Sequence, residues 1–480
     1  MTVLPPGRQF ALTWGIPHDF GGLTAAMLQR SRMFDRRGGA PVHVLTCDDR
    51  EDSADIADEL ARRRALSDGV RLTNLWDWVR DNDLDGRRVR EADGFAPLSS
   101  SAAEERTAGV LRRRVRTGAD GAVLQIDHLR ADGTLAASDR RDVPRASGRV
   151  RRVVVTCDHT GSPRAAWNGV RELYRAWLDR LTGGERSFLL VDSKAMARFA
   201  ADYRRPHVVV VHVVHGSHLT DDGTAIRPSR AEVFARLGAF DAVVFCTDRQ
   251  VRDVRRHAGR LPLLAAVAHP VAIPPGVDVA APRRGAVVLS RLAGIKRVED
   301  AIDAVRLARR EQPTLELDVY GDGPSRARLE ARAGGDPSIR FRGFDPAATE
   351  SLARASVLLM TSRSEAFSMV VAEAMASGCL PIAYDVPYGP RELIDDGGTG
   401  WLVPPGDVAA LADTLARATA LDDVALSRMR RAAIARARLY SAEAILERWA
   451  RTLTRAARRQ GLRRRTWRFR EVLRRRLRVR

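Results

Sequence analysis

The sequence predicts an α/β protein with two domains, each built on a parallel β-sheet. Two successive series of alternating strand and helix patterns indicate these sheets, because parallel strands need long crossover connections. A proline-rich stretch, Pro270–Pro282, separates the two series, and 480 residues exceed the size of one ordinary core. We therefore expect a first domain at residues 1–270, a linker at 271–285, a second domain at 286–459 and a tail at 460–480.

The first domain begins with apolar runs that predict strands and with apolar residues at helical spacing that predict helices. The run Val208–Val214 is dense in β-branched residues, which is typical of a strand buried on both faces of a parallel sheet. In chain order we expect the strand Arg8–Trp14, the helix Leu23–Arg37, the strand Val42–Cys47, the helix Ile56–Ala65, and the strands Val208–Val214 and Ala242–Thr247.

Residues 87–188 interrupt this alternation of strands and helices. The strand-like segments Val123–Leu129 and Arg151–Thr156 are each followed by turn residues, at Asp132-Gly133 and at Thr160–Pro163. Short strands joined by such turns predict antiparallel hairpins, because so short a connection cannot cross over a sheet. We therefore expect an antiparallel β-hairpin insertion, at about residues 87–188, in the first domain.

The second domain repeats the alternation with short apolar strands. In chain order we expect the strand Ala286–Ser290, the helix Val298–Glu311, the strands Leu315–Tyr320, Ile339–Arg342 and Val357–Thr361, the helix Met369–Ser377, the strand Leu380–Tyr384, and helices from Asp407 to about Arg459. Parallel α/β sheets bind ligands outside the carboxyl ends of their strands, so we expect a ligand cleft there.

The composition excludes several classes of protein. The chain is 45% hydrophobic, which favours packed cores over disorder, and no apolar stretch approaches the ~18 residues that a membrane span needs. The N-terminus lacks the charged and then apolar pattern of a signal peptide, so we expect a cytoplasmic protein. Four widely spaced cysteines without a C-x-x-C motif predict neither a zinc site nor a disulfide framework.

Nearly half of the net charge of +20 lies at the C-terminus. Residues 461–480 hold ten arginines and one glutamate, and Phe469, Val472, Leu473 and Leu477 recur at helical spacing. This pattern predicts a basic amphipathic helix. Three roles for it stay open: contact with an anionic membrane surface, contact with a polyanionic acceptor, or a solvated helix end.

Two glutamates follow the predicted strand Val357–Thr361. Glu365 lies in the loop after the strand, and Glu373 lies about one turn into the next helix. The residues between them include Ala366–Ser368, which precede the helix, where backbone N–H groups bind anions. One carboxylate beside a sugar and one near a ribose is a consistent assignment. The alternative is two exposed helix glutamates.

A second motif, Ser290–Arg297, follows the first strand of the second domain. Arg291 and Lys296 flank Gly294 in a short loop. A guanidinium fork and an ammonium group together suit the two phosphates of a nucleoside diphosphate. The alternative is a pair of solvated surface cations. Lys296 is one of only two lysines among 80 basic residues, which favours a functional role.

Together with Tyr320–Pro324, Arg342–Phe344 and Tyr388–Ile394, these motifs resemble the retaining nucleotide-sugar glycosyltransferases of family 4. The resemblance is dense over residues 286–405. It implies the GT-B fold, in which two Rossmann-like domains face a cleft. The segments Pro387–Pro390 and Gly21–Leu28 and the hairpin insertion are similar to the branch of poly(glycerol-phosphate) α-glucosyltransferases, which decorate wall teichoic acid, and serine-rich-protein O-glycosyltransferases.

The resemblance implies a metal-independent hexosyltransferase that needs no cofactor and uses a UDP-sugar donor, with glucose or N-acetylglucosamine as the sugar. Arg291 and Lys296 would stabilise the leaving diphosphate. Glu365 would contact the donor sugar near the reacting centre, and Glu373 the ribose hydroxyls. The residues implied in nucleotide-sugar binding are Gly21, Gly22, Arg291, Lys296, Gly343, Phe344, Ala366, Phe367, Ser368 and Glu373.

In this branch an active-site histidine follows the last buried strand of the first domain. His215 is the best match by position, and His218 is the alternative. No metal site is expected. The acidic segment Asp81–Asp85 could be mistaken for a metal-binding motif, but it lies in a polar stretch outside the strand–helix alternation, which predicts a loop.

The expected acceptor is a polymeric phosphate of the cell wall or a protein hydroxyl. In the relatives that the resemblance names, the insertion serves acceptor binding or oligomerisation, so a homo-oligomer is plausible. The basic tail is a reason to expect the protein at the inner face of the membrane, as a peripheral protein.

Two other functions compete: a nucleic-acid-binding protein, which the charge alone would favour, and a non-catalytic glycan-binding subunit, which would be expected to lose the Arg291–Lys296 pair or the glutamates. We expect no nucleic-acid partner, because nearly half of the basic excess lies on the tail and the sequence has no RRM, KH, zinc-finger or clear helix-turn-helix pattern. A pyridoxal-phosphate phosphorylase is disfavoured, since only Lys194 and Lys296 could form a Schiff base.

Overall fold

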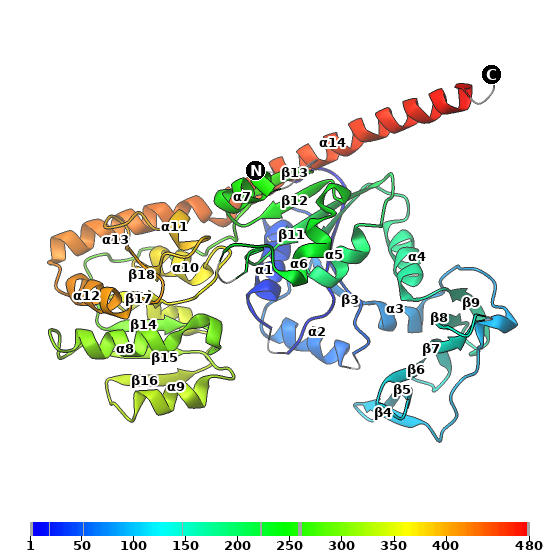
Figure 1. The fold of residues 1–480 in the computed structure, drawn as a ribbon, viewed down its shortest axis with the longest axis horizontal. Helices are drawn as coiled ribbons and strands as arrows, with labels where there is room; N and C mark the ends of the chain where they lie inside the picture. Colours follow the sequence, from blue (N-terminus) through cyan, green and yellow to red (C-terminus); the bar gives the residue numbers. More distant parts are fainter. Residues whose placement is uncertain are drawn as a thin grey trace. The chain divides into compact units, whose positions relative to one another are not determined.

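The structure is a computed structural model that describes residues 3–18, 20–50, 52–145, 147–220, 223–257 and 262–477. Its strands form two parallel sheets, as predicted, and one antiparallel sheet (Figure 1). The four cysteines are all buried and none is paired in a disulfide. Within the described residues, no helix is long and apolar enough to cross a membrane.

The second parallel sheet has the strand order β16-β15-β14-β17-β18-β19. Its strands are β14 (Ala286–Leu289), β15 (Leu317–Tyr320), β16 (Ile339–Gly343), β17 (Val357–Met360), β18 (Leu380–Tyr384) and β19 (Trp401–Val403). The helices are α8 (Val298–Ala308), α9 (Arg326–Ala333), α10 (Met369–Ala376), α11 (Pro390–Leu393), α12 (Val408–Thr419) and α13 (Asp423–Ala437), with short 3-10 helices η3 (Gly294–Lys296), η4 (Ala348–Ala353) and η5 (Arg438–Tyr440). Helix α8 packs against α9 and α12, and α10 packs against α13.

The first parallel sheet has the strand order β13-β12-β11-β10-β1-β2-β3. Its strands are β1 (Arg8–Leu12), β2 (Val42–Thr46), β3 (Val70–Asn74), β10 (Ser187–Val191), β11 (Val208–Val214), β12 (Ala242–Phe245) and β13 (Leu263–Ala266). The helices between them are α1 (Gly22–Arg36), α2 (Ser53–Arg62), α3 (Leu75–Asp81), α4 (Val170–Thr182), α5 (Lys194–Ala200), α6 (Pro228–Phe234) and α7 (Asp248–His257), with the 3-10 helices η1 (Glu91–Asp93) and η2 (Leu237–Ala239). All seven residues of β11 are buried, which confirms the prediction from its β-branched run.

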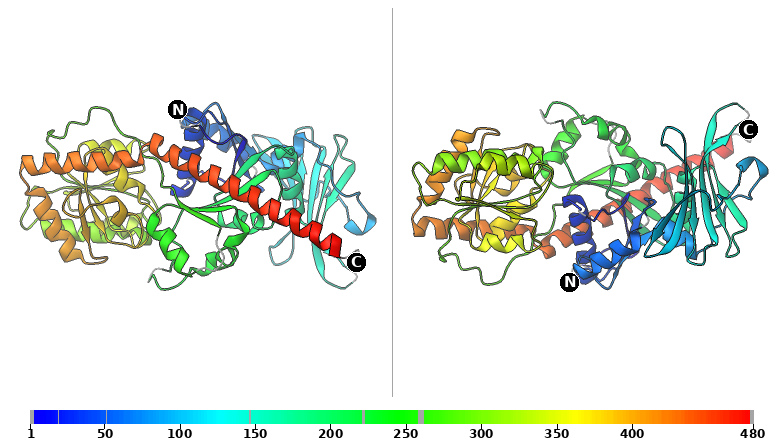
Figure 2. Two further views of the ribbon diagram at one scale, coloured as in Figure 1. Left: turned by 90° about the horizontal axis from the view of Figure 1, so that it is seen from above. Right: turned by 90° about the horizontal axis from the view of Figure 1, so that it is seen from below.

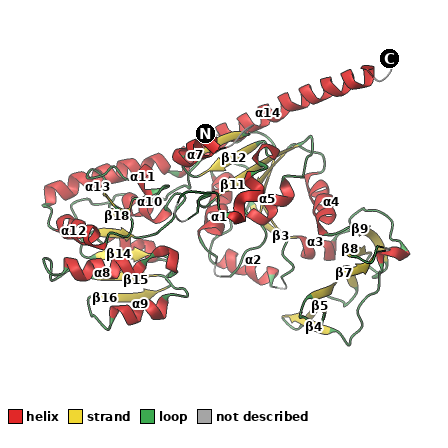
Figure 3. Cartoon of the chain, viewed as in Figure 1, coloured by secondary structure: helices red, strands yellow, loops and turns green. Residues whose placement is uncertain are grey.

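The antiparallel sheet is a meander of six strands in sequence order (Figure 2). These are β4 (Ala103–Thr107), β5 (Val110–Thr117), β6 (Val123–Leu129), β7 (Leu135–Pro144), β8 (Val150–Cys157) and β9 (Pro163–Trp167). Gly133 has φ +84° in the tight turn between β6 and β7, where residues with a Cβ are strained. In Figure 3 this stretch is strands and turns, in contrast to the alternating elements of the parallel sheets.

The range expected for the insertion, residues 87–188, contains more than this antiparallel sheet. Helix α4 follows β9, and β10 begins at Ser187 and pairs in parallel with β1. The sequence alone did not separate β10 from the antiparallel insertion, because Ser187–Val191 is a short apolar run that is typical of strands in both parallel and antiparallel sheets. The remaining helix, α14 (Ala442–Leu477), continues through the predicted tail. Side chains from residue 463 onward lie outside the described part, so the roles considered for the tail stay predictions.

The chain folds as two compact units. The N-terminal unit is mainly Leu4–His212, and the C-terminal unit is mainly Val213–Gly238 and Ala242–Arg455. The boundaries expected at residues 270 and 286 stay predictions. The C-terminal unit contains every candidate site residue except Gly21 and Gly22.

Candidate functional site

Lys296 and Glu365 meet at the carboxyl ends of neighbouring strands. Lys296 ends η3 in the loop after β14, and Glu365 lies in the loop after β17, which is paired with β14. The connections after β14 lead to β15 on one side, whereas β17 returns on the other side, so the order of the strands reverses between β14 and β17. Such a switch point is where open α/β sheets bind ligands. The Nζ of Lys296 lies 2.7 Å from Oε1 of Glu365.

Backbone contacts hold these two loops together. The Thr361 hydroxyl donates to the Lys296 carbonyl at 2.9 Å, and the Arg363 N–H donates to the Ile295 carbonyl at 2.9 Å. On the other side, a Cβ on Gly321 would lie 1.8 Å from the Ser290 carbonyl oxygen, and the φ of Gly321 is +126°. The loop after β15 can therefore pack on the loop after β14 only with glycine at this position.

The local charge favours an anion beside this ion pair. Lys296 and Glu365 neutralise each other, and their side chains are 28% and 13% exposed. Arg291 is exposed, and within the described residues its guanidinium has no carboxylate partner. Because the ion pair is neutral, the guanidinium of Arg291 supplies the positive charge available in the loop after β14.

The segment before α10 is buried and strained. Ala366, Phe367 and Ser368 are 7%, 2% and 5% exposed. Ser368 has φ +68°, a conformation that costs a non-glycine residue energy and that is concentrated at functional sites. Its buried hydroxyl, like that of Ser290 at the end of β14, has no hydrogen-bond partner among the described residues. On α10, burial raises the pKa of Glu373.

The two candidate histidines occupy different surroundings. The ring of His218 is 1% exposed and stacks between Phe234, at 5.3 Å, and Tyr388, at 5.6 Å, as measured between ring centroids. Its Nδ1 also lies 3.3 Å from Nε2 of Gln250. His215 is half-buried at the end of β11. The packing of His218 leaves its ring no face for a substrate, whereas His215 keeps partial exposure.

A third histidine, His269, joins His215 to the segment before α10. The rings of His215 and His269 stack with centroids 5.4 Å apart and planes 10° apart. The other side of His269 meets the edge of Phe367 at 5.9 Å, and its Nε2 lies 3.5 Å from Sγ of Cys246. Sequence reasoning missed His269, although its position three residues after the end of the apolar strand β13 is a signal that could have identified it.

The remaining candidates lie at strand and helix ends. Gly343 ends β16, and Phe344 beyond it is 67% exposed. In the N-terminal unit Gly21 precedes α1 and Gly22 begins it, and no atom lies within 4 Å of a Cβ built on either. The segment Asp81–Asp85 is only partly the predicted loop. Asp81 is the last residue of α3, which directly follows β3 of the parallel sheet, and the next four residues are a loop in which Asp83 and Asp85 pair with Arg164.

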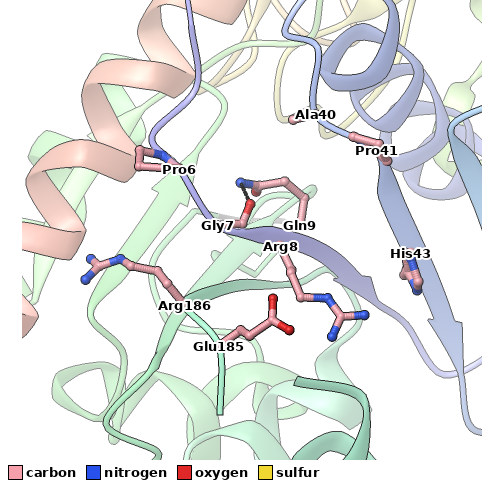
Figure 4. A pocket seen from close by; sticks show the side chains of 9 residues that line it. All are labelled: Pro6, Gly7, Arg8, Gln9, Ala40, Pro41, His43, Glu185 and Arg186. Atoms are coloured by element: carbon pink, nitrogen blue, oxygen red, sulfur yellow. Dashed lines mark hydrogen bonds between the residues drawn. The ribbon is translucent and has the colours of Figure 1, made fainter. Parts of the chain in front are cut away.

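A cavity of about 670 Å³ in the N-terminal unit lies at the opposite ends of the strands (Figure 4). It is lined by residues at the amino ends of β1, β2 and β10, among them Arg8, His43 and Arg186. Because parallel sheets bind ligands at the carboxyl ends, this cavity is not the candidate site. Within the described residues no group of three or more His, Cys, Asp and Glu side chains is placed to hold a metal ion.

Sequence comparisons identify relatives of this chain. Residues 283–420 match the family described as glycosyl transferases group 1. An exopolysaccharide phosphotransferase of Streptomyces coelicolor is 34% identical over 236 residues, which are 48% of this chain and 24% of that protein. The poly(glycerol-phosphate) alpha-glucosyltransferase of Bacillus subtilis is 25% identical over 288 residues, 58% of this chain and 43% of that protein. The chain thus spans less than half of the length of either relative.

Solved structures share the fold over nearly the whole chain. Staphylococcus aureus TarM, crystallised with Fondaparinux, alpha-GlcNAc-glycerol and UDP, superimposes with a TM-score of 0.71 at 17% identity and covers 93% of this chain and 100% of its own. The pneumococcal O-GlcNAc transferase GtfA, with UDP and GlcNAc, gives 0.70 at 19% identity, covering 94% and 99%. Residues 283–420 are therefore similar to the group 1 glycosyltransferases, and the chain has the GT-B fold of these solved structures.

Proposed function

We propose that this chain is a retaining glycosyltransferase that moves glucose or N-acetylglucosamine from a UDP-sugar to a hydroxyl of a phosphate-containing cell-wall polymer, such as poly(glycerol phosphate), or of a protein. The observation that carries the proposal is the 2.7 Å pair of Lys296 and Glu365 at the switch point between β14 and β17. The relatives that transfer sugars to poly(glycerol phosphate) and to peptides support the choice of acceptor.

In the proposed reaction the acceptor hydroxyl oxygen bonds to the anomeric carbon while the bond from that carbon to the β-phosphate oxygen breaks. Attack on the face that the leaving group vacates retains the configuration, and the departing phosphate takes the acceptor's proton. Arg291 and Lys296 stabilise the charge that develops on the diphosphate, as fixed cations do in a site with little water. Glu365 contacts the sugar, and Glu373 binds the ribose hydroxyls.

His215 is the proposed active-site histidine of this reaction, and His269 holds its ring by stacking. Gly343 and Phe344 are assigned to the base, and Ala366–Ser368 to the sugar and phosphates through their backbone N–H groups. The proposal also places the protein at the cytoplasmic face of the membrane through its basic tail, and it assigns the antiparallel sheet to acceptor binding or to contacts between copies of the chain.

The test is nucleotide release from UDP-glucose and from UDP-N-acetylglucosamine, with and without a glycerol-phosphate polymer, in the presence of EDTA. We expect UDP to be released, the rate to rise with polymer and EDTA to leave it unchanged, because fixed cations supply the charge. A rate of UDP release that does not change when the polymer is added would reject this acceptor. No release from either donor, with intact binding of glycan, would reject the enzyme in favour of a glycan-binding subunit.

A second candidate is transfer of a sugar phosphate, which the similarity to an exopolysaccharide phosphotransferase favours. In that reaction the acceptor oxygen bonds to the β-phosphorus of the UDP-sugar and the bond between the two phosphates breaks, so UMP leaves. Chromatography of the released nucleotide separates the two candidates. UDP supports glycosyl transfer, and UMP supports sugar-phosphate transfer.

Substitution of Gly22 separates a role in donor binding from a role in folding. We expect Gly22→Ala to leave stability unchanged or to raise it by up to about 1 kcal/mol, because alanine favours the helix and no atom obstructs its Cβ. The same methyl group should raise KM for the UDP-sugar about tenfold if the backbone approaches the phosphates, a loss of about 1.4 kcal/mol of binding. Gly461→Ala, also in a helix with open space around it, is the control and should leave KM unchanged.

A further inference from the structure

A polar pocket of about 370 Å³ lies in the C-terminal unit, outside the pair of Lys296 and Glu365. Helix α7, α11, the end of α13 with η5, and the beginning of α14 surround it. Its lining includes the arginines Arg252, Arg391, Arg436 and Arg448 and the acids Asp248 and Glu392. Four cations and two anions leave a positive excess in this open pocket.

The four arginines of the lining differ in how many of their N–H groups bond to other parts of the protein. Arg391 pairs with Asp385, and Arg436 donates to the carbonyl oxygens of Leu393 and Glu392 at 2.9 and 2.7 Å. Arg252 is exposed, and Arg448 is half-buried with its guanidinium 5.8 Å from the centre of the Tyr440 ring. Within the described residues neither Arg252 nor Arg448 pairs with a carboxylate, so both keep their N–H donors for a ligand.

The acids do not cancel this charge. The carboxylate of Glu392 accepts hydrogen bonds from the backbone N–H groups of Asp248, at 3.0 Å, and Arg249, at 2.7 Å, at the start of α7. Its negative charge is therefore matched by the N-terminus of that helix. Asp248 is exposed at the rim, where water screens its charge. Among the described residues, Arg252, Arg436 and Arg448 form no ion pair with a carboxylate, so their positive charge exceeds the negative charge of the lining.

We propose that this pocket binds a phosphate group. Guanidinium groups from three separate helices can surround a tetrahedral anion with paired N–H donors, and arginine is preferred over lysine for this geometry. The wall is completed by Phe367, whose ring packs on His269 and Tyr440 with centroids 5.9 and 5.1 Å away. The pocket therefore reaches the back of the segment that precedes α10.

Two sources supply this chemistry: a phosphodiester of a glycerol-phosphate acceptor chain, or free inorganic phosphate. Only the first source rests on the proposed function. Phosphate binding itself needs no sugar donor and no turnover, so it is measured apart from the transferase reaction.

The experiment is calorimetric titration of the full-length protein with inorganic phosphate and, separately, with glycerol-phosphate oligomers. The pocket variant is Arg252→Gln/Arg448→Gln. The control is Arg428→Gln/Arg431→Gln, which removes the same charge from exposed positions on α13 that do not line the pocket. Thermal unfolding of each variant and titration with UDP report on the fold and on the donor site.

We expect the pocket variant to bind phosphate at least tenfold more weakly than the wild type, with the affinity for UDP unchanged, and the control to match the wild type. Tighter binding of oligomers than of inorganic phosphate identifies the acceptor polymer as the source, and binding of inorganic phosphate alone identifies the small ion. Equal affinities in the pocket variant and the control, or no phosphate binding by the wild type, would overturn the proposal. If the double variant unfolds, the same phosphate titration is done on Arg252→Gln alone. This variant should fold, because the side chain of Arg252 is exposed and pairs with no described carboxylate.

Discussion

Replacing Lys296 by alanine is expected to lower kcat for sugar transfer about 10²- to 10³-fold, the usual loss when one fixed group that stabilises developing charge is removed. Lys296 lies at the switch point because it ends the 3-10 turn η3 and because its backbone carbonyl oxygen accepts a hydrogen bond from the Thr361 hydroxyl. Its carboxylate partner Glu365 would remain half-buried without a counterion and would repel the leaving diphosphate. The loss of the positive charge of Lys296 and the repulsion between Glu365 and the diphosphate both lower kcat.

Steady-state kinetics on purified Lys296→Ala, with far-UV circular dichroism to confirm folding, measures this effect. Lys194→Ala removes the only other lysine, which begins α5 in the N-terminal unit, and should keep wild-type rates. Glu365→Ala is expected to lose turnover by a similar factor. A rate within a few-fold of the wild type in either Lys296→Ala or Glu365→Ala would refute the assignment of this pair to the reaction.

Substitutions of His215 and His218 are expected to separate catalysis from stability. His215→Ala should reduce kcat by orders of magnitude with little change in Tm, because the half-buried ring lies at the end of β11 and stacks on His269. His218→Ala should instead destabilise the fold by about 2 kcal/mol or more, because it leaves a cavity between Phe234 and Tyr388.

Thermal unfolding and kinetics on both variants give the comparison. His269→Phe preserves an aromatic ring beside His215 and serves as a further control, since stacking alone should keep most of the activity. The reverse outcome, in which His218→Ala folds normally and loses turnover while His215→Ala is active, would assign the histidine role to His218.

Local features of the chain were sufficient to predict most of the elements that carry the site. The strand expected at Leu380–Tyr384 has those bounds in the structure, and the helix expected at Met369–Ser377 ends one residue earlier. Hydrophobic runs and helical spacing record which residues face a core, so they determine the type of each element and nearly its ends. They do not record which strand lies beside which.

The pair of Lys296 and Glu365 shows the limit of that information. The residues are 69 positions apart, and only the pairing of β14 with β17 brings their loops together. Likewise, His215 and His218 are three residues apart and equally polar, and only the packing of Phe234 and Tyr388 around one of them distinguishes the two.

The sequence by itself determined the α/β class, the antiparallel insertion, the strand ends that carry Arg291, Lys296 and Glu365, the helix that carries Glu373, and the resemblance to sugar transferases. Tertiary structure decided the order of the strands, the contact of His269 with His215 and Phe367, and the position of arginines from four helices around one pocket. The physical reason is that side-chain periodicity is set within a few residues, whereas strand order and the clustering of charged side chains depend on contacts between segments far apart along the chain.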